Sequence, residues 1–289
     1  MERKLMFALV ALVTLAGCKE KAQDIQSAGN FNCAVHSGSV SCWGSYTVEN
    51  EEGGFDTVDV SSRHDGYADP KMAVGVGHYC ILDEGQVECF LDNSFGQTEV
   101  PDLVAPTHIA AGPKFTCVTD QSELKCWGDN DSLDVFPLPR ELVNPRDLVA
   151  GVSHVCVLDD LGVACKGFTI FDGGDPNPSF PIMPTQITSS PSSLSTCGYD
   201  DQWYCWGGTA TDNPDGFGDF DIVIPGREQA CGLSNGQVEC WGESAFYTDT
   251  VNDSSTNPTA LAIGLINLCV IANEGVVCDG NAGPVPDYL

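Results

Sequence analysis

The stretch "CILDEGQVEC", Cys80 to Cys89, places two cysteines nine positions apart, with a glycine just past the midpoint and apolar residues on either side. The chain has 289 residues and 15 cysteines, and variants of this phrase recur along it. Fourteen cysteines fall into seven pairs, six with a spacing of nine and one with a spacing of eight: Cys33 with Cys42, Cys80 with Cys89, Cys117 with Cys126, Cys156 with Cys165, Cys197 with Cys205, Cys231 with Cys240 and Cys269 with Cys278. Cys18 has no partner in this pattern.

Each phrase has the pattern of a β-hairpin that a disulfide closes. The midpoints include Ser37-Gly38, Glu84-Gly85 and Asn235-Gly236, and such dipeptides favour two-residue primed turns, in which both residues have positive φ. Counting outward from Ser37-Gly38 makes Cys33 and Cys42 a non-hydrogen-bonded pair, whose Cα atoms lie about 4.5 Å apart, within reach of a disulfide. The spacing of eight between Cys197 and Cys205 predicts a different turn or a bulge.

The hairpins belong to a longer repeat. The first cysteines of successive pairs are 47, 37, 39, 41, 34 and 38 residues apart, and a period near forty is typical of arrays in which one unit cannot bury its own apolar face. The residues two positions inside the cysteines, such as Leu82 and Val87, are mainly apolar. This face of each hairpin is therefore expected to pack against a neighbouring unit.

A tryptophan column follows the second cysteine, in the phrases "SCWGS", "KCWGD", "YCWGG" and "ECWGE". Together with "NSFGQTEVP" at Asn93 to Pro101, this pattern resembles the regulator-of-chromosome-condensation repeat family. The resemblance covers the chain after residue 28 and implies an all-β fold, a seven-bladed β-propeller with short antiparallel blades and, here, one disulfide in each blade. The paired cysteines depart from the family pattern. The tryptophans are expected to pack between blades rather than to form a recognition ring.

The two ends of the chain suggest how the ring closes. The final segment "GPVPDYL" matches the "EVPDLV" that precedes the third unit, while the first unit has no such lead-in. Val285 to Leu289 is therefore predicted to complete the first blade.

The N-terminus, "MERKLMFALVALVTLAGCKE", reads as a secretory signal. Arg3 and Lys4 precede an apolar run that is too short to span a bilayer, and Leu15 to Cys18 resembles the bacterial lipobox, which implies lipid attachment to Cys18. The predicted organisation is a lipoprotein signal peptide over 1–17, a lipid-anchored tether over 18–28 and the propeller over 29–289. The alternative is an ordinary cleaved signal with an incidental cysteine. The expected location is the bacterial cell envelope, with Lys19 favouring the outer membrane and the domain facing the periplasm or the exterior.

Export also explains the cysteines, because thiols outside the cytoplasm pair as disulfides. No CxxC motif occurs in the sequence, which argues against a zinc ribbon.

The composition is strongly acidic, with 41 Asp and Glu against 12 Lys and Arg. Without residues 1–17, which hold Glu2, Arg3 and Lys4, 40 acidic and 10 basic residues remain, a formal charge of −30. This charge opposes nucleic-acid binding and suits a cationic protein or small ligand, although it also serves solubility alone. The family's nucleotide-exchange role is not carried over, because the compartment and the charge oppose it. A monomer that contacts the membrane only through its anchor is expected.

The sequence predicts no catalytic residue, cofactor or metal site, and the protein is expected not to be an enzyme. His78 and His154 occupy a repeat position that also accepts Phe31, Gln229 and Asn267, which indicates a structural role. Acidic loops could offer oxygen ligands to calcium, but neither has the EF-hand spacing; their carboxylates are Asp129, Asp131 and Asp134 in one loop and Asp215, Asp219 and Asp221 in the other.

Two long insertions, Ser45 to Lys71 and Phe168 to Ser193, are the candidate recognition loops. Their aromatic residues are the candidate binding residues: Tyr46, Phe55, Tyr67, Phe171 and Phe180. The alternative is that both are merely tolerated insertions. The function predicted from the sequence is a protein- or ligand-binding module at the cell envelope. An envelope enzyme (a lyase or a hydrolase) and a structural or adhesion component are the alternatives.

Overall fold

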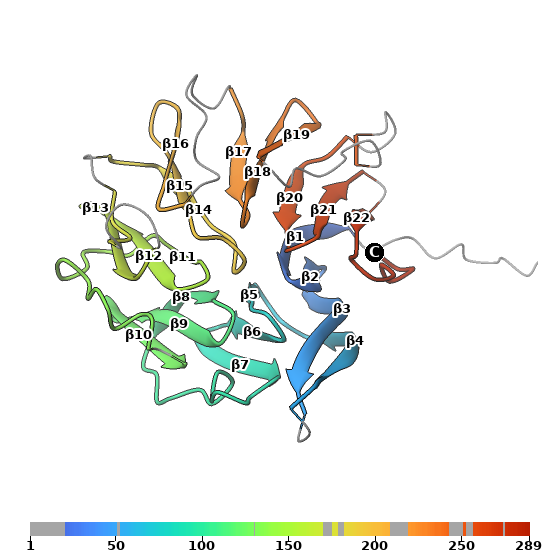
Figure 1. The fold of residues 1–289 in the computed structure, drawn as a ribbon, viewed down its shortest axis with the longest axis horizontal. Helices are drawn as coiled ribbons and strands as arrows, with labels where there is room; N and C mark the ends of the chain where they lie inside the picture. The colour runs from blue at the N-terminus through green and yellow to red at the C-terminus, as the bar shows by residue number, and fades with distance from the viewer. Residues whose placement is uncertain are drawn as a thin grey trace, which may run out of the picture.

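The described part of the chain forms seven antiparallel sheets arranged as the blades of a ring (Figure 1). The computed structural model describes residues 21–50, 53–129, 131–169, 175–178, 182–208, 219–242, 251–252, 257–273 and 275–289. The predicted all-β, seven-bladed propeller is confirmed. The inner strand of each blade comes first in sequence and lies nearest the centre of the ring (Figure 1).

The blades follow one another in chain order. Blade 1 contains β1 (Ala22–Ala28), β2 (Asn30–His36), β3 (Ser39–Glu49) and β4 (Phe55–Asp65). Blades 2 to 4 contain β5 (Lys71–Val74), β6 (His78–Asp83) and β7 (Gln86–Leu91); β8 (Pro106–Ala111), β9 (Phe115–Asp120) and β10 (Glu123–Gly128); and β11 (Asp147–Ala150), β12 (His154–Asp159) and β13 (Gly162–Gly167). Blades 5 to 7 contain β14 (Gln186–Thr188), β15 (Thr196–Tyr199) and β16 (Trp203–Trp206); β17 (Ile222–Pro225), β18 (Gln229–Ser234) and β19 (Gln237–Gly242); and β20 (Ala260–Ile263), β21 (Asn267–Ala272) and β22 (Gly275–Gly280).

The hairpin that joins the second and third strands of a blade has the predicted register. Cys33 lies opposite Cys42, and Val35 lies opposite Val40. Ser37 and Gly38 form the two-residue turn with φ of 48° and 74°, as primed turns require.

All seven predicted disulfides are present, and each lies within one hairpin with a Cα separation of 3.9 to 4.1 Å. The bonds join Cys33 to Cys42, Cys80 to Cys89, Cys117 to Cys126, Cys156 to Cys165, Cys197 to Cys205, Cys231 to Cys240, and Cys269 to Cys278. The pair spaced by eight is accommodated by a three-residue loop, because Tyr199 lies opposite Trp203.

The two cysteines of a disulfide differ in burial. The first cysteine of every pair is fully buried, because it lies on the middle strand of its blade. The second lies on the third strand, nearer the rim, where Cys126, Cys240 and Cys278 are only half-buried. These three still pack against the apolar clusters between blades.

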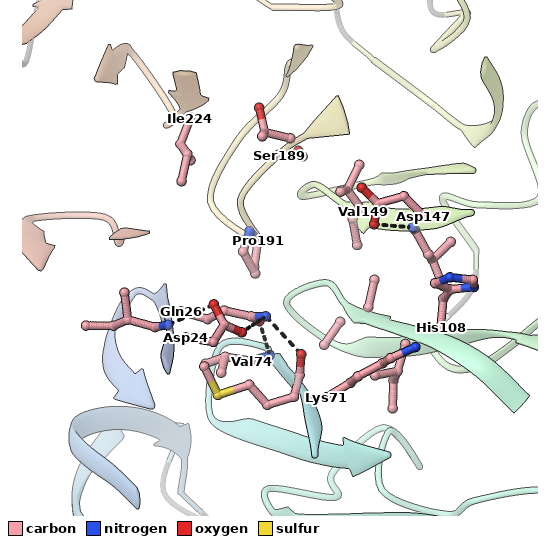
Figure 2. A pocket seen from close by; sticks show the side chains of 18 of the residues that line it. Asp24, Gln26, Lys71, Val74, His108, Asp147, Val149, Ser189, Pro191 and Ile224 are labelled. Atoms are coloured by element: carbon pink, nitrogen blue, oxygen red, sulfur yellow. Dashed lines mark hydrogen bonds between the residues drawn. The ribbon is translucent and has the colours of Figure 1, made fainter. Parts of the chain in front are cut away.

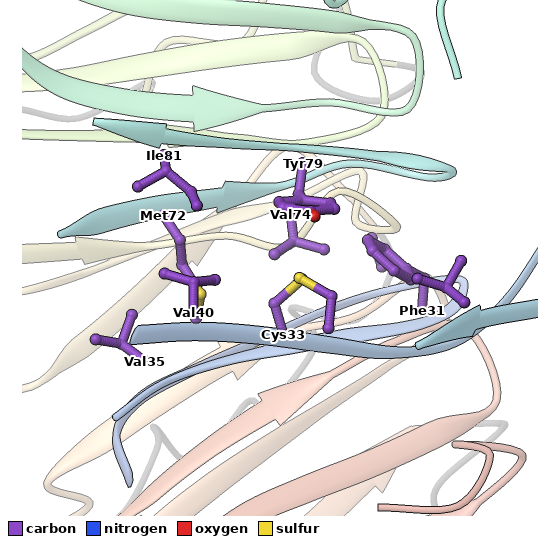
Figure 3. Packing of buried hydrophobic residues seen from close by; sticks show 11 residues of the cluster. Phe31, Cys33, Val35, Val40, Met72, Val74, Tyr79 and Ile81 are labelled. Atoms are coloured by element: carbon purple, nitrogen blue, oxygen red, sulfur yellow. A yellow bond between two sulfur atoms is a disulfide. The ribbon is translucent and has the colours of Figure 1, made fainter. Parts of the chain in front are cut away.

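The disulfide face of each blade packs against the next blade. Figure 3 shows this for blades 1 and 2, where Cys33, Val35 and Val40 face Met72 and Ile81. The same arrangement recurs around the ring and includes the contact of blade 7 with blade 1, where Cys269 packs with Ile25, Ala34 and Trp43. The apolar cluster between neighbouring blades is therefore the repeating unit of the core.

An aliphatic side chain from each inner strand covers the preceding disulfide. In each blade, one residue of the inner strand pairs with the first cysteine of the same blade, and the aliphatic residue comes directly before it in sequence. The seven aliphatic residues are Ile25, Met72, Ile109, Leu148, Ile187, Val223 and Leu261. All seven are buried, and burying one such side chain contributes about 2 kcal/mol. The tryptophan column adds to the same clusters, as predicted: Trp43, Trp127, Trp206 and Trp241 each pack with the disulfide of the preceding blade.

Polar side chains also join neighbouring blades at the turn that follows the inner strand. The Nε2 atom of His154 lies 2.8 Å from Oγ1 of Thr196 in blade 5, and Nε2 of His78 lies 2.9 Å from Oγ1 of Thr116 in blade 3. Gly151 allows the His154 ring to fold over the turn, because a Cβ atom at this glycine would collide with the imidazole. Asn267 and Asn32 make the corresponding bond between blades 7 and 1, at 2.6 Å.

The end of the second strand in several blades carries an aspartate that fixes the incoming loop. Asp120 accepts hydrogen bonds from the backbone N–H groups of Val104 and Ala105 and pairs with Lys125 at 2.7 Å. Asp159 accepts one from Val143 at 2.8 Å and pairs with Arg140. These hydrogen bonds hold the pKa of both carboxyl groups below the ordinary value, against the opposing effect of burial.

The first blade begins earlier than predicted. Residues 22–28, expected to belong to the tether, form β1, which pairs with β2 from Ala22 to Ala28. The segment "AQDIQSA" has a single large apolar residue, Ile25, so its alternation is too weak to mark a strand from sequence alone. The propeller therefore starts at Ala22 rather than at residue 29.

The C-terminal segment closes the ring, but not as a strand. Leu289 is buried in the cluster between blades 7 and 1, and the Tyr288 hydroxyl lies 3.1 Å from Oγ of Ser41. The Asn32 amide donates to the Ala282 carbonyl at 3.0 Å. The fourth strand of blade 1 is instead β4, which comes from the first insertion and pairs with β3 along its whole length. Among the described residues no helix is long and apolar enough to cross a membrane.

The buried histidines predict a specific loss of stability in acid. Burial lowers the pKa of His154 to about 4, whereas the unfolded chain has the ordinary value near 6.5. The neutral ring therefore stabilises the fold fully above about pH 6.5, and this contribution falls toward pH 4, by at most about 3 kcal/mol. In the His154→Gln variant, the free energy of unfolding should fall by correspondingly less between pH 7 and pH 4.

Urea denaturation across this pH range measures the difference between the two proteins. Glutamine is a suitable replacement because Gln229 occupies the equivalent position in blade 6. Parallel pH profiles for the wild-type protein and His154→Gln would contradict the assignment of a neutral, buried imidazole.

Candidate functional site

The inner strands of all seven blades surround a central channel with a volume of about 430 Å³. Its wall is formed by β1, β5, β8, β11, β14, β17 and β20 together with the residues that follow β14. The volume lies within the range of small-molecule sites, about 300–1,000 Å³. The channel is therefore the candidate functional site.

One layer of the channel gathers chemically diverse residues from equivalent positions of the inner strands. By register, these residues lie opposite the mainly apolar column of the second strands: Asp24, Lys71, His108, Asp147, Ile222 and Ala260. Gln186 has this register position in blade 5 but does not line the cavity. Blades 1 to 4 thus contribute titratable groups, while blades 6 and 7 contribute aliphatic ones. We refer to this layer as the channel mouth, and it has a polar side and an apolar side.

On the polar side, the Lys71 charge acts on both His108 and Asp147. Figure 2 shows Lys71 extended toward His108, and its Nζ donates to the Thr107 carbonyl at 2.7 Å. Nδ1 of His108 lies 3.0 Å from Oγ1 of Thr119. Burial and the Lys71 charge both lower the pKa of His108. Burial raises the pKa of Asp147, and the Lys71 charge opposes this change.

Asp24 lies apart from these residues. Its carboxylate accepts a hydrogen bond from the Ile25 N–H at 2.8 Å and a long one from the Gln26 amide at 3.5 Å. The channel wall partly desolvates the Asp24 carboxylate and so raises its pKa, although the side chain remains exposed to solvent. The Gln26 amide is held elsewhere, because it donates to the Met72 carbonyl at 2.9 Å and accepts from the Val74 N–H at 3.2 Å (Figure 2).

A loop of blade 5 crosses the other end of the channel. Ser192 occupies the position at which five units have a glycine. The loop is also longer in blade 5, because the paired residues Thr188 and Cys197 are nine positions apart in sequence, whereas Ala73 and Cys80 of blade 2 are seven apart. Oγ of Ser192 accepts from the Gly29 N–H of blade 1 at 3.4 Å, and the Ser193 carbonyl accepts from the Val152 N–H of blade 4 at 2.8 Å.

We call residues 189–193 the plug. Pro191 of the plug lies between the surrounding inner strands in Figure 2 and lines the cavity. Because the plug contacts blades 1 and 4, it crosses this end of the channel, opposite the mouth.

The candidate residues predicted from the insertions lie elsewhere. Tyr46 and Tyr67 pack against the cluster between blades 1 and 2, and the Tyr67 hydroxyl donates to Glu88 at 3.1 Å. Burial and the Glu88 carboxylate raise the pKa of Tyr67 to about 12. Phe55, at the start of β4, is 74% exposed. Phe171, Phe180 and Cys18 lie outside the described residues.

Asn177, in the described part of the second insertion, lies beside the outer strand of blade 4. Its side chain accepts from the Cys165 N–H at 2.8 Å and donates to the Cys165 carbonyl at 3.2 Å. It therefore satisfies backbone groups of β13, much as β4 does for β3 in blade 1. The end of the same insertion forms β14 and the plug.

The chain resembles solved structures of other propeller proteins. The entire ectodomain of the receptor kinase CR4 from Physcomitrella patens matches with a TM-score of 0.65 and 20% identity, over 92% of this chain and 75% of its own. The ectodomain of ACR4 from Arabidopsis thaliana, described as a CRINKLY WD40 domain, matches with a TM-score of 0.57 and 20% identity, over 92% and 98% of the two chains.

Human WBSCR16 matches with a TM-score of 0.61 and 13% identity, over 88% of each chain. What these neighbours share with this chain is the fold. No protein-family model and no curated protein matches the chain.

Sequence analysis did not identify the channel mouth. Its residues recur nine positions before the first cysteine in six units, as in Lys71, His108 and Asp147. The signal for the mouth in the sequence is a column at a fixed position of the repeat. This column holds polar residues in some units and aliphatic residues in others.

The acidic loops proposed for calcium show other contacts. Asp134 pairs with Lys166 at 2.9 Å, and Asp221 accepts a hydrogen bond from the Asn235 N–H at 3.4 Å. Asp215 lies outside the described residues. Within the part of the chain that the structure describes, no group of three or more His, Cys, Asp or Glu side chains could hold a metal ion.

Proposed function

We propose that this protein is a binding module of the bacterial cell envelope that captures its partner at the open mouth of the central channel. The observation that carries this proposal is the convergence of Asp24, Lys71, His108 and Asp147 from four successive blades on one layer of the central cavity. Rigid strands position these side chains, as preorganised recognition requires.

The lipid anchor on Cys18 belongs to the same proposal. The apolar run before Cys18 and the cysteine pairs of an oxidising compartment support export. Two of the similar structures are ectodomains of plant receptor kinases, so this type of propeller occurs outside cells. A location at the outer membrane and a monomeric state are parts of the proposal, and the acidic charge supports a partner other than nucleic acid.

Binding without catalysis fits the hydrogen bonding along the channel. An enzyme at this place requires a nucleophile or general base that is free to act. His108 is held between Thr107 and Thr119, and the Ser189 hydroxyl donates to the Ser195 carbonyl rather than to a base. The channel does bring carboxylate and histidine groups together, so steady turnover of an envelope substrate that is lost in Asp147→Asn would favour the enzyme alternative.

Lipid attachment at Cys18 is testable by metabolic labelling. Cells fed an alkyne analogue of palmitate should label the wild-type protein but not Cys18→Ser, because only Cys18 offers the attachment thiol. The wild-type protein should partition into the detergent phase of a Triton X-114 extraction. Equal labelling and equal partitioning of the two proteins would contradict the anchor.

Capture at the mouth is testable with paired variants of the full chain in detergent. The Asp24→Asn/Asp147→Asn protein should retain much less envelope material than the wild-type protein, because both substitutions remove charge from the mouth while keeping the shape of the side chains. The control is Asp59→Asn/Asp102→Asn, which removes the same charge from exposed positions. Equal retention by mouth and control variants would move the binding site away from the channel.

A further inference from the structure

Asp24 is a carboxylate in a walled cavity without a compensating cation. No Lys, Arg or His of the described chain forms an ion pair with it, whereas the buried Asp120 and Asp159 pair with Lys125 and Arg140. The Asp24 side chain remains exposed to solvent in the channel, so an incoming ligand can reach its carboxylate. A ligand that brings a cation to Asp24 would supply the opposite charge that the described chain does not provide there.

The nearby cation of the mouth is directed away from Asp24. Lys71 extends toward His108 (Figure 2), where its Nζ is held by the Thr107 carbonyl. With His108 neutral, the mouth carries two carboxylates and one ammonium, a net charge of −1. An anionic ligand would meet this net negative charge and the formal charge of −29 of the whole chain, and the same field attracts cations.

The wall beside Asp24 is apolar. Lys71 belongs to blade 2, on one side of blade 1, whereas blade 7 and then blade 6 lie on the other side. Blade 7 contributes Ala260 to the cavity wall, and blade 6 contributes Ile222 and Ile224. These three side chains are only half-buried, so they offer apolar surface to a ligand. A carboxylate next to an aliphatic wall is complementary to a cationic group on an apolar body.

The plug end of the channel has a separate polar feature. Ser190 of the plug is 3% exposed, and its hydroxyl has no hydrogen-bond partner among the described residues. It lines a second cavity of about 70 Å³, which shares Gln26, Pro191 and Ile224 with the channel wall, whereas Ser190 itself does not line the channel. Buried hydroxyl groups are normally paired, so this one can pair with a polar atom that reaches the second cavity.

We propose that the channel mouth binds an organic monocation, an ammonium or guanidinium group on an apolar body, with the cation at Asp24 and the body against Ile222, Ile224 and Ala260. This inference rests on the proposed function and names the ligand chemistry of the same site. A free amine and a lysine or arginine side chain of a partner protein share this chemistry.

Calorimetric titration of the full chain with pentylammonium chloride tests the proposal. Pentylammonium should bind at one saturable site, while 1-pentanol, sodium pentanoate and methylammonium should bind at least about tenfold more weakly, since each lacks the charge, its sign or the apolar body. Comparison with the blocked peptide acetyl-Gly-Lys-Gly-amide distinguishes the sources, because tighter peptide binding indicates a side chain of a protein partner.

Three variants locate the site. Asp24→Asn should weaken pentylammonium binding at least about tenfold, and Asp59→Asn, which removes an exposed charge, should leave it unchanged. Lys71→Met should strengthen binding several-fold, an effect that a folding defect cannot produce. Equal affinity for pentanol and pentylammonium, or equal affinity of Asp24→Asn and the wild-type protein, would overturn the inference. If envelope capture still depended on the mouth in that case, the proposed function would stand and only the cationic ligand would be wrong.

Discussion

The structure depends on the contact between the disulfide face of one blade and the inner strand of the next. A blade of three short strands cannot cover this face by itself. The disulfide brings two strands to Cα separations near 4 Å and leaves an apolar ridge, on which an aliphatic residue such as Met72 or Ile109 lies. Every blade has one such ridge and covers the ridge of the preceding blade. All seven ridges are therefore covered only when the last blade packs against the first. Covalent closure of each hairpin, worth about 2.5 kcal/mol in the chain-entropy model, keeps the ridge in one register.

Much of this architecture could be predicted from local sequence. The turn at Ser37-Gly38 determines the pairing of Cys33 with Cys42, because residue parity in an antiparallel hairpin is fixed by the turn. The number of blades follows from the repeat. What could not be predicted depends on contacts between distant segments: β1 has one large apolar residue, and Leu289 closes the ring through packing rather than through strand pairing. The sequence predicts a loop for the first insertion, which instead supplies β4.

The channel mouth was missed for a related reason. Asp24 and Asp147 are 123 positions apart in sequence, and only the ring brings them to one layer. Repeat positions that vary in chemistry look like unconstrained surface until the inner strands are known to face a common cavity. Ser192 was the visible clue at the other end, since it departs from the glycine of five other units. Its physical meaning, a longer loop that crosses the channel, required the structure.

The two ends of the channel differ in structure. The plug crosses one end of the channel and makes hydrogen bonds with Gly29 and Val152. The mouth stays open, and charge from blades 1 to 4 faces aliphatic surface from blades 6 and 7. A scaffold made rigid by packing and disulfides holds the unpaired carboxylate of Asp24 in a fixed position, where the side chain stays exposed to solvent in the channel.

The most direct test of this architecture is a peptide map of the unreduced protein, digested at acidic pH so that disulfides do not exchange. The account predicts seven linkages, each within one hairpin, with cysteine spacings of nine or, for Cys197 and Cys205, eight. Linkages between different hairpins, or free thiols among these fourteen cysteines in exported protein, would contradict it.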